Sequence, residues 1–137
     1  MFVEMNLNDI VATSESINLY NNGEMTTYKK NETPYNQIVE GWMRLLETSR
    51  EMPAFGVSLN GETLEARNSG LWVEFVFDRQ YTRNGMSFEK LLLKVEKDWH
   101  GFNVVRYNAQ GGYSGRCYFF DLVDKNMSKF YDILCNL

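Results

Sequence analysis

The chain contains few of the residues from which most chemical sites are built. Among its 137 residues there are one histidine and two cysteines, namely His100, Cys117 and Cys135. Zinc typically takes three or four Cys, His or carboxylate ligands at recognisable spacing, and these three residues do not supply such a set. No stretch approaches the ~20 consecutive apolar residues that span a bilayer. We therefore expect no metal, no other cofactor and no membrane span.

An excess of positive charge is also missing. The chain has 14 basic and 18 acidic residues, a net charge of −4, whereas proteins that bind duplex nucleic acid usually present a basic face. Arg106, Tyr107, Arg116 and Tyr118 interleave arginines with rings on expected strands, and such a surface can stack single-stranded bases. They lack the ribonucleoprotein motif of known sheet readers. We therefore do not expect nucleic acid as a partner.

The first fifteen residues, MFVEMNLNDIVATSE, contain neither the basic segment nor the apolar run of a secretory signal. This favours a cytoplasmic protein, in which Cys117 and Cys135 are reduced thiols. Alternating apolar residues up to Leu7 favour a strand here. Leu7, Ile10 and Val11 also have the spacing of a helical turn, so both structures are compatible with this segment.

What the chain does contain is a large apolar fraction. Hydrophobic residues make up 44% of it and aromatic residues 15%, which is more than a disordered chain carries. A chain of this length buries roughly 68% of its unfolded surface, so it needs no metal or disulfide to fold. The length, together with the lack of a linker or repeat, predicts one compact domain over residues 1–137.

The clearest element is a long helix near residues 33–51. Pro34 suits the first helical turn, where its missing N–H is not needed. Apolar residues then recur at intervals of three and four and form one stripe: Tyr35, Ile38, Val39, Trp42, Leu45 and Leu46. Pro53 is expected to end the helix, because the residue before a proline is disfavoured in the α conformation. The spacing predicts that Trp42 is a core ring.

Strands are expected in most of the remaining chain. An N-terminal hairpin is predicted around Asn22-Gly23, because both residues tolerate positive φ. From residue 70 four segments have the character of strands: LWVEFVFD, FEKLLLKVEK, FNVVRY and RCYFFDL. Short polar connections that contain glycine separate them, the first being residues 79–87. Consecutive strands joined in this way pair antiparallel, so we predict a four-stranded meander.

The expected fold is α+β. It is a mostly antiparallel sheet of about six strands, made from the N-terminal hairpin and the C-terminal meander, with the helix near 33–51 and a C-terminal helix near 125–135. Apolar residues including Phe130 and Leu134 lie on one face of this second helix. The segment 60–70 is compatible with either a strand or a helical turn.

Two stretches that could be taken for chemical sites are better explained as turns. His100 lies in KDWHGF, and histidine-assisted catalysis also needs an activated nucleophile and an orienting group, for which the sequence carries no signature. NAQGGYSG lacks the lysine and hydroxyl residue of a phosphate-binding loop. Carboxylates on or beside the strands, Glu74 among them, are no more frequent than on any sheet with a wet face. We predict no catalytic residue.

One strand departs from the pattern of a wet face. If the phase that includes Phe75 faces the helices, then Trp72, Val76 and Leu92 face the other way. An antiparallel sheet with one solvated face usually alternates cleanly, so these residues predict a second face that is covered. The cover could be the N-terminal hairpin, a curled sheet, a small ligand or another chain. We predict partner-binding residues at Trp72, Val76 and Leu92, through which the chain forms a homodimer or binds another protein.

Two classes of function remain. The residues resemble no known family, and they lack nucleophile, metal and phosphate signatures. This favours a non-catalytic binding or protein-interaction module. The alternative is a small enzyme, or a small-ligand-binding domain, with a pocket between the sheet and the helices. A pocket lined by charged groups with perturbed pKa values would favour the alternative.

Overall fold

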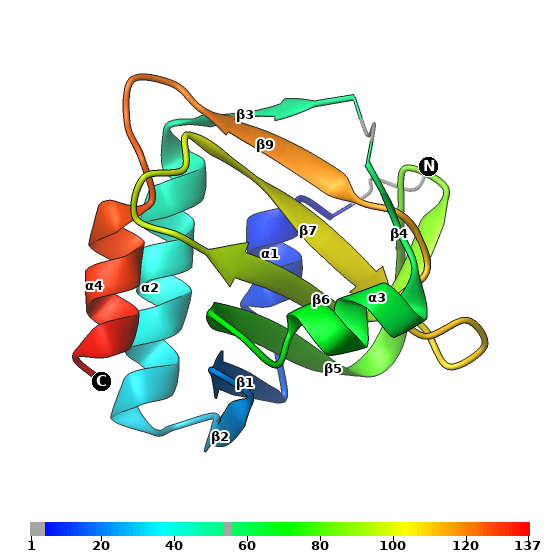
Figure 1. Ribbon diagram of the computed structural model, residues 1–137, viewed down its shortest axis with the longest axis horizontal. Helices are drawn as coiled ribbons and strands as arrows, with labels where there is room; N and C mark the ends of the chain where they lie inside the picture. Colours follow the sequence, from blue (N-terminus) through cyan, green and yellow to red (C-terminus); the bar gives the residue numbers. More distant parts are fainter. Residues whose placement is uncertain (1–4, 54–55) are drawn as a thin grey trace.

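The computed structural model describes residues 5–53 and 56–137, and these form the predicted α+β fold (Figure 1). The helices in these residues are α1 (Leu7–Val11), α2 (Thr33–Glu47), α3 (Asn60–Ala66) and α4 (Ser128–Cys135). The strands are β1 (Ser16–Asn21), β2 (Glu24–Lys29), β3 (Ser49–Met52), β4 (Val57–Ser58), β5 (Leu71–Arg83), β6 (Met86–Val95), β7 (Gly101–Tyr107), β8 (Gly115–Arg116) and β9 (Tyr118–Leu122). None of these helices is long and apolar enough to cross a membrane.

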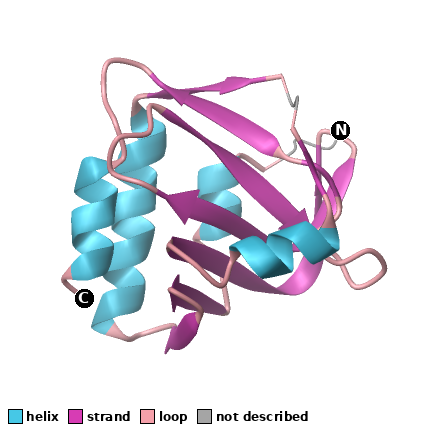
Figure 2. Ribbon diagram, viewed as in Figure 1, coloured by secondary structure: helices cyan, strands magenta, loops and turns pink. Residues whose placement is uncertain are grey.

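Seven of the strands form one antiparallel sheet in the order β2-β1-β5-β6-β7-β9-β3 (Figure 2). The N-terminal hairpin and the four-stranded meander are therefore confirmed, and β1 joins them by pairing with β5. The short strands β4 and β8 form a separate antiparallel pair. The sheet divides the molecule, because α1 lies behind it and α3 in front of it in the view of Figure 1.

The first connection of the meander is shorter than expected. Residues 79–87 were predicted to be a loop, but β5 continues to Arg83 and only Asn84-Gly85 turns, with φ of 54° and 74°. The pairing with β6 is irregular between Val76 and Tyr81. This irregularity bends the strand where its apolar alternation stops, which explains why the sequence pattern indicated a loop there. Asn22-Gly23 turns the first hairpin in the same way.

The long helix is also shorter than expected, since α2 ends at Glu47 rather than near residue 51. The Ser49 hydroxyl donates to the Leu46 carbonyl at 2.8 Å. The next residues form β3, which pairs with β9 at the edge of the sheet. A short strand such as β3 forms because it pairs with β9, which is distant in the sequence, and its own residues give no local signal. Pro53 was therefore the wrong residue from which to predict the end of the helix.

The two ambiguous segments are both helical. The strand that we favoured near Leu7 is wrong for the described residues: Asn6 caps α1 by accepting from the Asp9 N–H at 2.9 Å, and Leu7, Ile10 and Val11 are buried. Residues 1–4 lie outside the described residues. The segment 60–70 begins with α3, so the helical alternative holds there.

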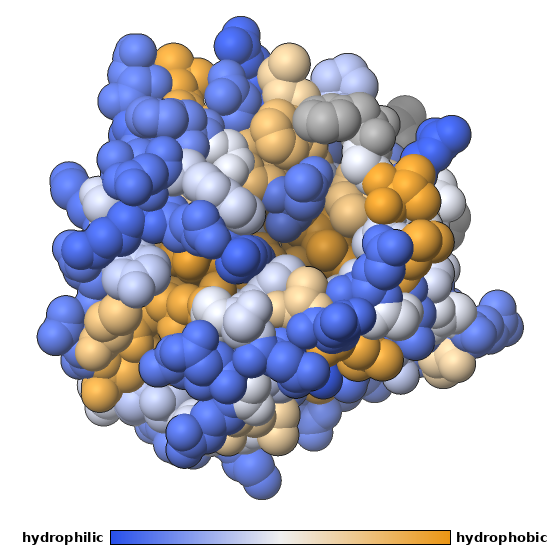
Figure 3. Space-filling view, viewed as in Figure 1, coloured by the Kyte–Doolittle hydropathy of each residue, from blue (hydrophilic) through white to orange (hydrophobic). Residues whose placement is uncertain are grey.

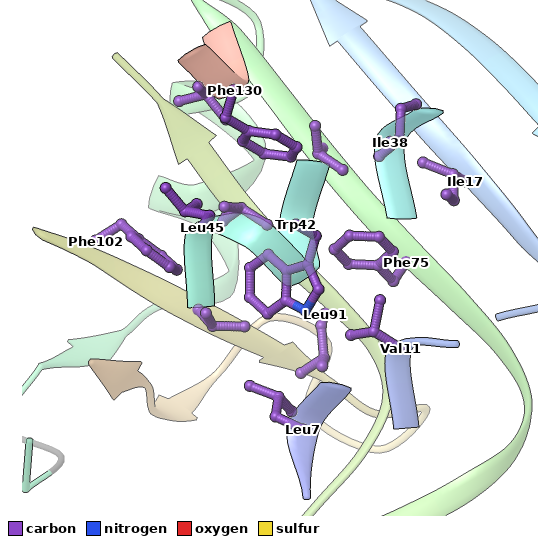
Figure 4. Close-up of a cluster of buried hydrophobic side chains, with 14 of the residues drawn as sticks. Leu7, Val11, Ile17, Ile38, Trp42, Leu45, Phe75, Leu91, Phe102 and Phe130 are labelled. Atoms are coloured by element: carbon purple, nitrogen blue, oxygen red, sulfur yellow. The ribbon is translucent and has the colours of Figure 1, made fainter. Parts of the chain in front are cut away.

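The main core lies between α2 and the inner face of the sheet (Figure 4). Trp42 is fully buried, as predicted. Its ring centroid lies 5.4 Å from that of Phe75, 5.7 Å from Phe102 and 6.4 Å from Phe120, all edge-on. These partners come from β5, β7 and β9, so one side chain ties α2 to three strands.

The C-terminal helix α4 packs directly on α2, and the two lie side by side in Figure 1. Gly41 of α2 makes this close approach feasible. A Cβ at this position would lie 3.0 Å from side-chain carbons of both Ile133 and Phe130. The helix near 125–135 is therefore confirmed, beginning at Ser128.

Candidate binding pocket on the second face of the sheet

The second face of the sheet, turned away from α2, carries its own buried cluster. Pairing aligns Tyr20 with Trp72, and Leu92 with Val105, across neighbouring strands. These four residues form the cluster together with Tyr113 and Cys117. The predicted phase of Trp72 and Leu92 is therefore right, and the second face is covered.

The cover comes from segments that sequence reasoning did not consider. The stretch Gly56–Ser58 reaches the face through the Gly56 carbonyl, which accepts from the Cys117 N–H at 2.9 Å. The start of α3 is tied to the loop after β7, because Asn60 Oδ1 accepts from the Tyr113 N–H at 2.9 Å. The chain thus folds two loops and a short helix over its own sheet (Figure 1).

This cover accounts for the apolar residues that motivated a partner surface. Trp72 is 7% exposed and Leu92 is fully buried, both beneath residues of the same chain, while Val76 is half-buried. The Trp72 indole donates to the Ser69 carbonyl at 2.8 Å. Contact of a partner with these three residues stays a prediction, and it would require the covering segments to move away.

The cover is incomplete, and a pocket of about 240 Å³ remains beside Trp72. Figure 3 shows it as a hollow near the middle of this face with a hydrophobic floor. Its lining comes from β4 and the residue before it, from β5, β6 and β7, from the connection between β6 and β7, and from the residue before β9: Gly56, Val57, Ser58, Trp72, Lys94, Trp99, Asn103, Val105 and Cys117. Sequence reasoning missed this pocket, because its walls are brought together only by long-range pairing.

The mouth of the pocket is apolar and exposed. Val57 is 69% and Trp99 38% exposed. The Lys94 ammonium lies 5.9 Å from the ring centroid of Trp72 and 5.7 Å from that of Trp99, a weak cation–π arrangement. It also pairs with Glu96 at 3.0 Å. The pocket therefore has two indole walls. The ammonium group of Lys94 lies at one side of it and is already paired with Glu96.

Cys117 forms part of the floor. Burial raises the pKa of its thiol, an effect that contacts with Ser58 and the charge of Arg106 only partly offset. The nucleophilic form of cysteine is the thiolate, so this residue is held in its unreactive form. Cys117 and Cys135 are both free of disulfides.

Deeper on the same face lies a buried carboxylate, Glu74, which is fully inaccessible to solvent. It accepts from the Asn18 amide at 2.9 Å, from the Tyr20 hydroxyl at 3.0 Å, and from the Tyr113 hydroxyl. The Glu74 carboxylate on β5 is thus hydrogen-bonded by three neutral donors, two from β1 and one from the loop after β7. A buried carboxylate needs such bonds, because its desolvation is otherwise very costly.

A cation, Arg67, joins this network through Tyr113 rather than by direct contact with Glu74. The Arg67 guanidinium, just after α3, lies 4.3 Å from the centroid of Tyr20 and donates to the Tyr113 hydroxyl at 2.9 Å. Burial, and then the negative charge of Glu74, raise the pKa of Tyr20 to about 12 and that of Tyr113 still further. Both tyrosines therefore stay protonated and act as donors, so Tyr113 fastens its loop to the sheet.

Other residues considered from the sequence lie elsewhere. His100 is exposed and its Nδ1 lies 3.0 Å from the Lys125 carbonyl oxygen, which places it in a turn as expected. Arg106 is buried and donates to the carbonyls of Arg116 and Ser87, both at 2.7 Å. It therefore cannot present a base-stacking surface. In residues 5–53 and 56–137 no three His, Cys, Asp or Glu side chains lie together as a metal site would need.

No protein-family model, curated protein or solved structure matches this chain. Its function is therefore inferred from the geometry of the pocket and of the surface around it.

Proposed function

We propose that the protein is a cytoplasmic, non-catalytic binding module that contacts a protein partner at the mouth of the Trp72–Trp99 pocket. The observation that carries this proposal is the exposure of large apolar side chains beside an apolar hollow. Exposed apolar groups that gather around a concavity are typical of interaction sites, whereas scattered ones need no explanation.

A protein partner is favoured over a small ligand by the extent of the apolar surface. Leu59, which follows β4, is 57% exposed and lies outside the pocket lining. Together with Val57 and Trp99 it extends the apolar surface beyond the hollow. A partner that inserts one apolar side chain and covers this rim would remove several such groups from water. Each contributes roughly 1.5–3 kcal/mol when fully buried.

A non-catalytic role in the cytoplasm is supported by the chemistry of the walls. Cys117 is in the thiol form, and the Lys94 charge is paired with Glu96. Neither group is poised to attack or to transfer a proton. Two free cysteines also suit a reducing compartment.

Photo-cross-linking tests this proposal. A benzophenone amino acid replaces Leu59 in one variant and Met25 in a matched control. Met25 is also an exposed apolar residue, but it lies on the edge strand β2, which contributes no residue to the lining of the pocket. We expect one discrete protein adduct from position 59 in cells and none from position 25. The adduct should disappear when Val57→Asp places a charge at the rim.

The mass of the adduct identifies the partner class. An adduct of two copies of this chain would establish the homodimer, and light scattering of the purified chain would then show concentration-dependent association. An adduct with a different protein would establish a hetero-complex. Equal labelling from positions 59 and 25, or labelling that survives Val57→Asp, would contradict a partner at this pocket.

A further inference from the structure

A second pocket, of about 260 Å³, lies between α2 and α4, and it shares no residue with the first. Three of its lining residues are cations: Arg44 from α2, Lys129 from α4, and Lys125 from the segment before α4. No carboxylate is among the described residues that line it. Such a lining is unexpected in a chain of net charge −4.

None of the three cations of this pocket forms an ion pair with a carboxylate of the described residues. In the described part of the chain, the side chains of Arg44 and Lys129 make no hydrogen bond and no ion pair. Lys125 donates from its ammonium to the Arg44 carbonyl at 3.0 Å, which holds the head of the side chain over the end of α2. Most other cations have a partner, such as Lys97 with Asp132 or Arg50 with Asp121.

The acidic groups nearby do not fill the pocket. Glu47, at the end of α2, attracts Lys125. Glu40 and Asp132 line an adjoining hollow that they share with Arg44. Burial and the proximity of Lys129 together lower the pKa of Lys125, with burial the larger cause. Lys125 and Lys129 thus repel each other, and an anion bound beside them would relieve this repulsion.

Part of the remaining wall of the pocket is apolar, beside the polar residues Asn126 and Ser128. Leu45, Phe130 and Ile133 line it, and the first two are buried in the main core. A bare inorganic ion would leave this wall in contact with water. A ligand with a charged group for the cations and a small apolar body for the wall satisfies both parts.

We propose that the pocket between α2 and α4 binds a small organic phosphate, a monoester whose apolar group is about the size of one ring. Three cations favour a phosphate monoester, which carries close to two negative charges at neutral pH, over a carboxylate, which carries one. The volume is at the small end for ligand sites, so the body of the ligand is limited to one ring. Arginine can hold a phosphate through two parallel hydrogen bonds, and lysines add point charges.

Nuclear magnetic resonance titration tests the site with four probes: phenyl phosphate, benzoate, phenol and inorganic phosphate. We expect phenyl phosphate to bind most tightly and to shift the amide signals of Lys125, Lys129 and Phe130. Benzoate and inorganic phosphate should bind more weakly, and phenol should not bind measurably. Shifts confined to the Trp99 region would instead assign the probe to the other pocket and would contradict this proposal.

A matched pair of variants separates the local site from the net charge. Arg44→Gln with Lys129→Gln removes two cations from the pocket. Lys29→Gln with Lys30→Gln removes two exposed lysines at the end of β2 and leaves the same total charge. We expect the first pair to weaken phenyl phosphate binding about tenfold or more, since charged hydrogen bonds are lost. The second pair should leave binding within about twofold of wild type.

The conservative variant Arg44→Lys should keep part of the affinity, since it retains the charge and loses only the bidentate geometry. Circular dichroism checks that each variant is folded. Equal weakening in both double variants would show a general charge effect. Unchanged binding after Arg44→Gln with Lys129→Gln would show an adventitious interaction only. Either result would overturn the proposal.

Discussion

The two faces of the sheet are buried in different ways. The inner face, beneath α2, is packed almost entirely with apolar side chains around Trp42. The second face mixes a smaller apolar cluster with the buried carboxylate of Glu74, two tyrosines that donate to it, and an open pocket. Its cover consists of loops and one short helix rather than of long elements.

This difference indicates a division of roles. A dry, close-packed face contributes most of the stability, because apolar burial is the dominant favourable term in folding. A face that keeps a pocket and exposed apolar groups forgoes part of that stability, which is common at binding sites. Breaking each face should therefore have different consequences, as the following predictions state.

The largest effect is expected from Trp42→Ala on the inner face. Removal of a fully buried ring that contacts three strands should lower the free energy of unfolding by about 3–5 kcal/mol. Trp42→Phe is the matched control. The Trp42 indole N–H is buried without a hydrogen-bond partner among the described residues, so its loss removes an unsatisfied donor and the cost should be much smaller. Chemical denaturation measures both, and equal costs would argue against this core assignment.

A smaller effect is expected from Glu74→Leu on the second face. The Asn18, Tyr20 and Tyr113 donors would lose their acceptor. Burying the carboxylate itself is costly, so part of the loss is offset, and we expect a net destabilisation of about 2 kcal/mol. In a chain that also carries Tyr20→Phe and Tyr113→Phe, the same substitution should cost less, because fewer donors are stranded. A stabilised Glu74→Leu chain would refute the network.

Alkaline pH should weaken the second face in particular. The pKa of Tyr20 is raised from 10.0 to about 12, so between these values the unfolded chain binds fewer protons than the folded chain. The contribution of Tyr20 to the free energy of unfolding is therefore fully present below pH 10 and is lost as pH rises towards 12. Tyr113 acts in the same direction.

Denaturation at about pH 9 and about pH 11 tests this fall. The chain with Tyr20→Phe and Tyr113→Phe should lose most of it. Cys117 and Tyr35 should contribute to the remainder, since burial raises the pKa of each of these groups as well. An unchanged pH dependence in the double variant would show that the two tyrosines of the second face do not control it.

The sequence predicted the inner face better than the second face. The apolar stripe of Tyr35, Ile38 and Trp42 and the alternation from Leu71 to Phe77 are local patterns, and each element that they indicate is present. Local patterns also misled, since alternation near Leu7 favoured a strand where Asn6 caps a helix. Helix capping depends on a single side chain, and the spacing of apolar residues contains no information about it.

For the second face, the sequence predicted only which residues point towards it and that it is covered. Trp72 and Leu92 were placed on a covered face, but the cover depends on Gly56–Ser58, α3 and Tyr113, which are far apart in the sequence. Glu74 was treated as one of many surface carboxylates. A signal for its burial did exist, because it shares the phase of Trp72 within a strand that is otherwise apolar from Leu71 to Phe77.

The central claim, that one face stabilises the chain while the other binds, is tested most directly by Trp99→Ala. The measurement is the yield of the cross-link from position 59 in this variant, taken together with its free energy of unfolding. Trp99 is 38% exposed, so its removal should cost about 1 kcal/mol or less. We predict that the adduct is lost while stability is nearly unchanged. An adduct that persists, or a destabilisation as large as that of Trp42→Ala, would contradict the division of roles between the two faces.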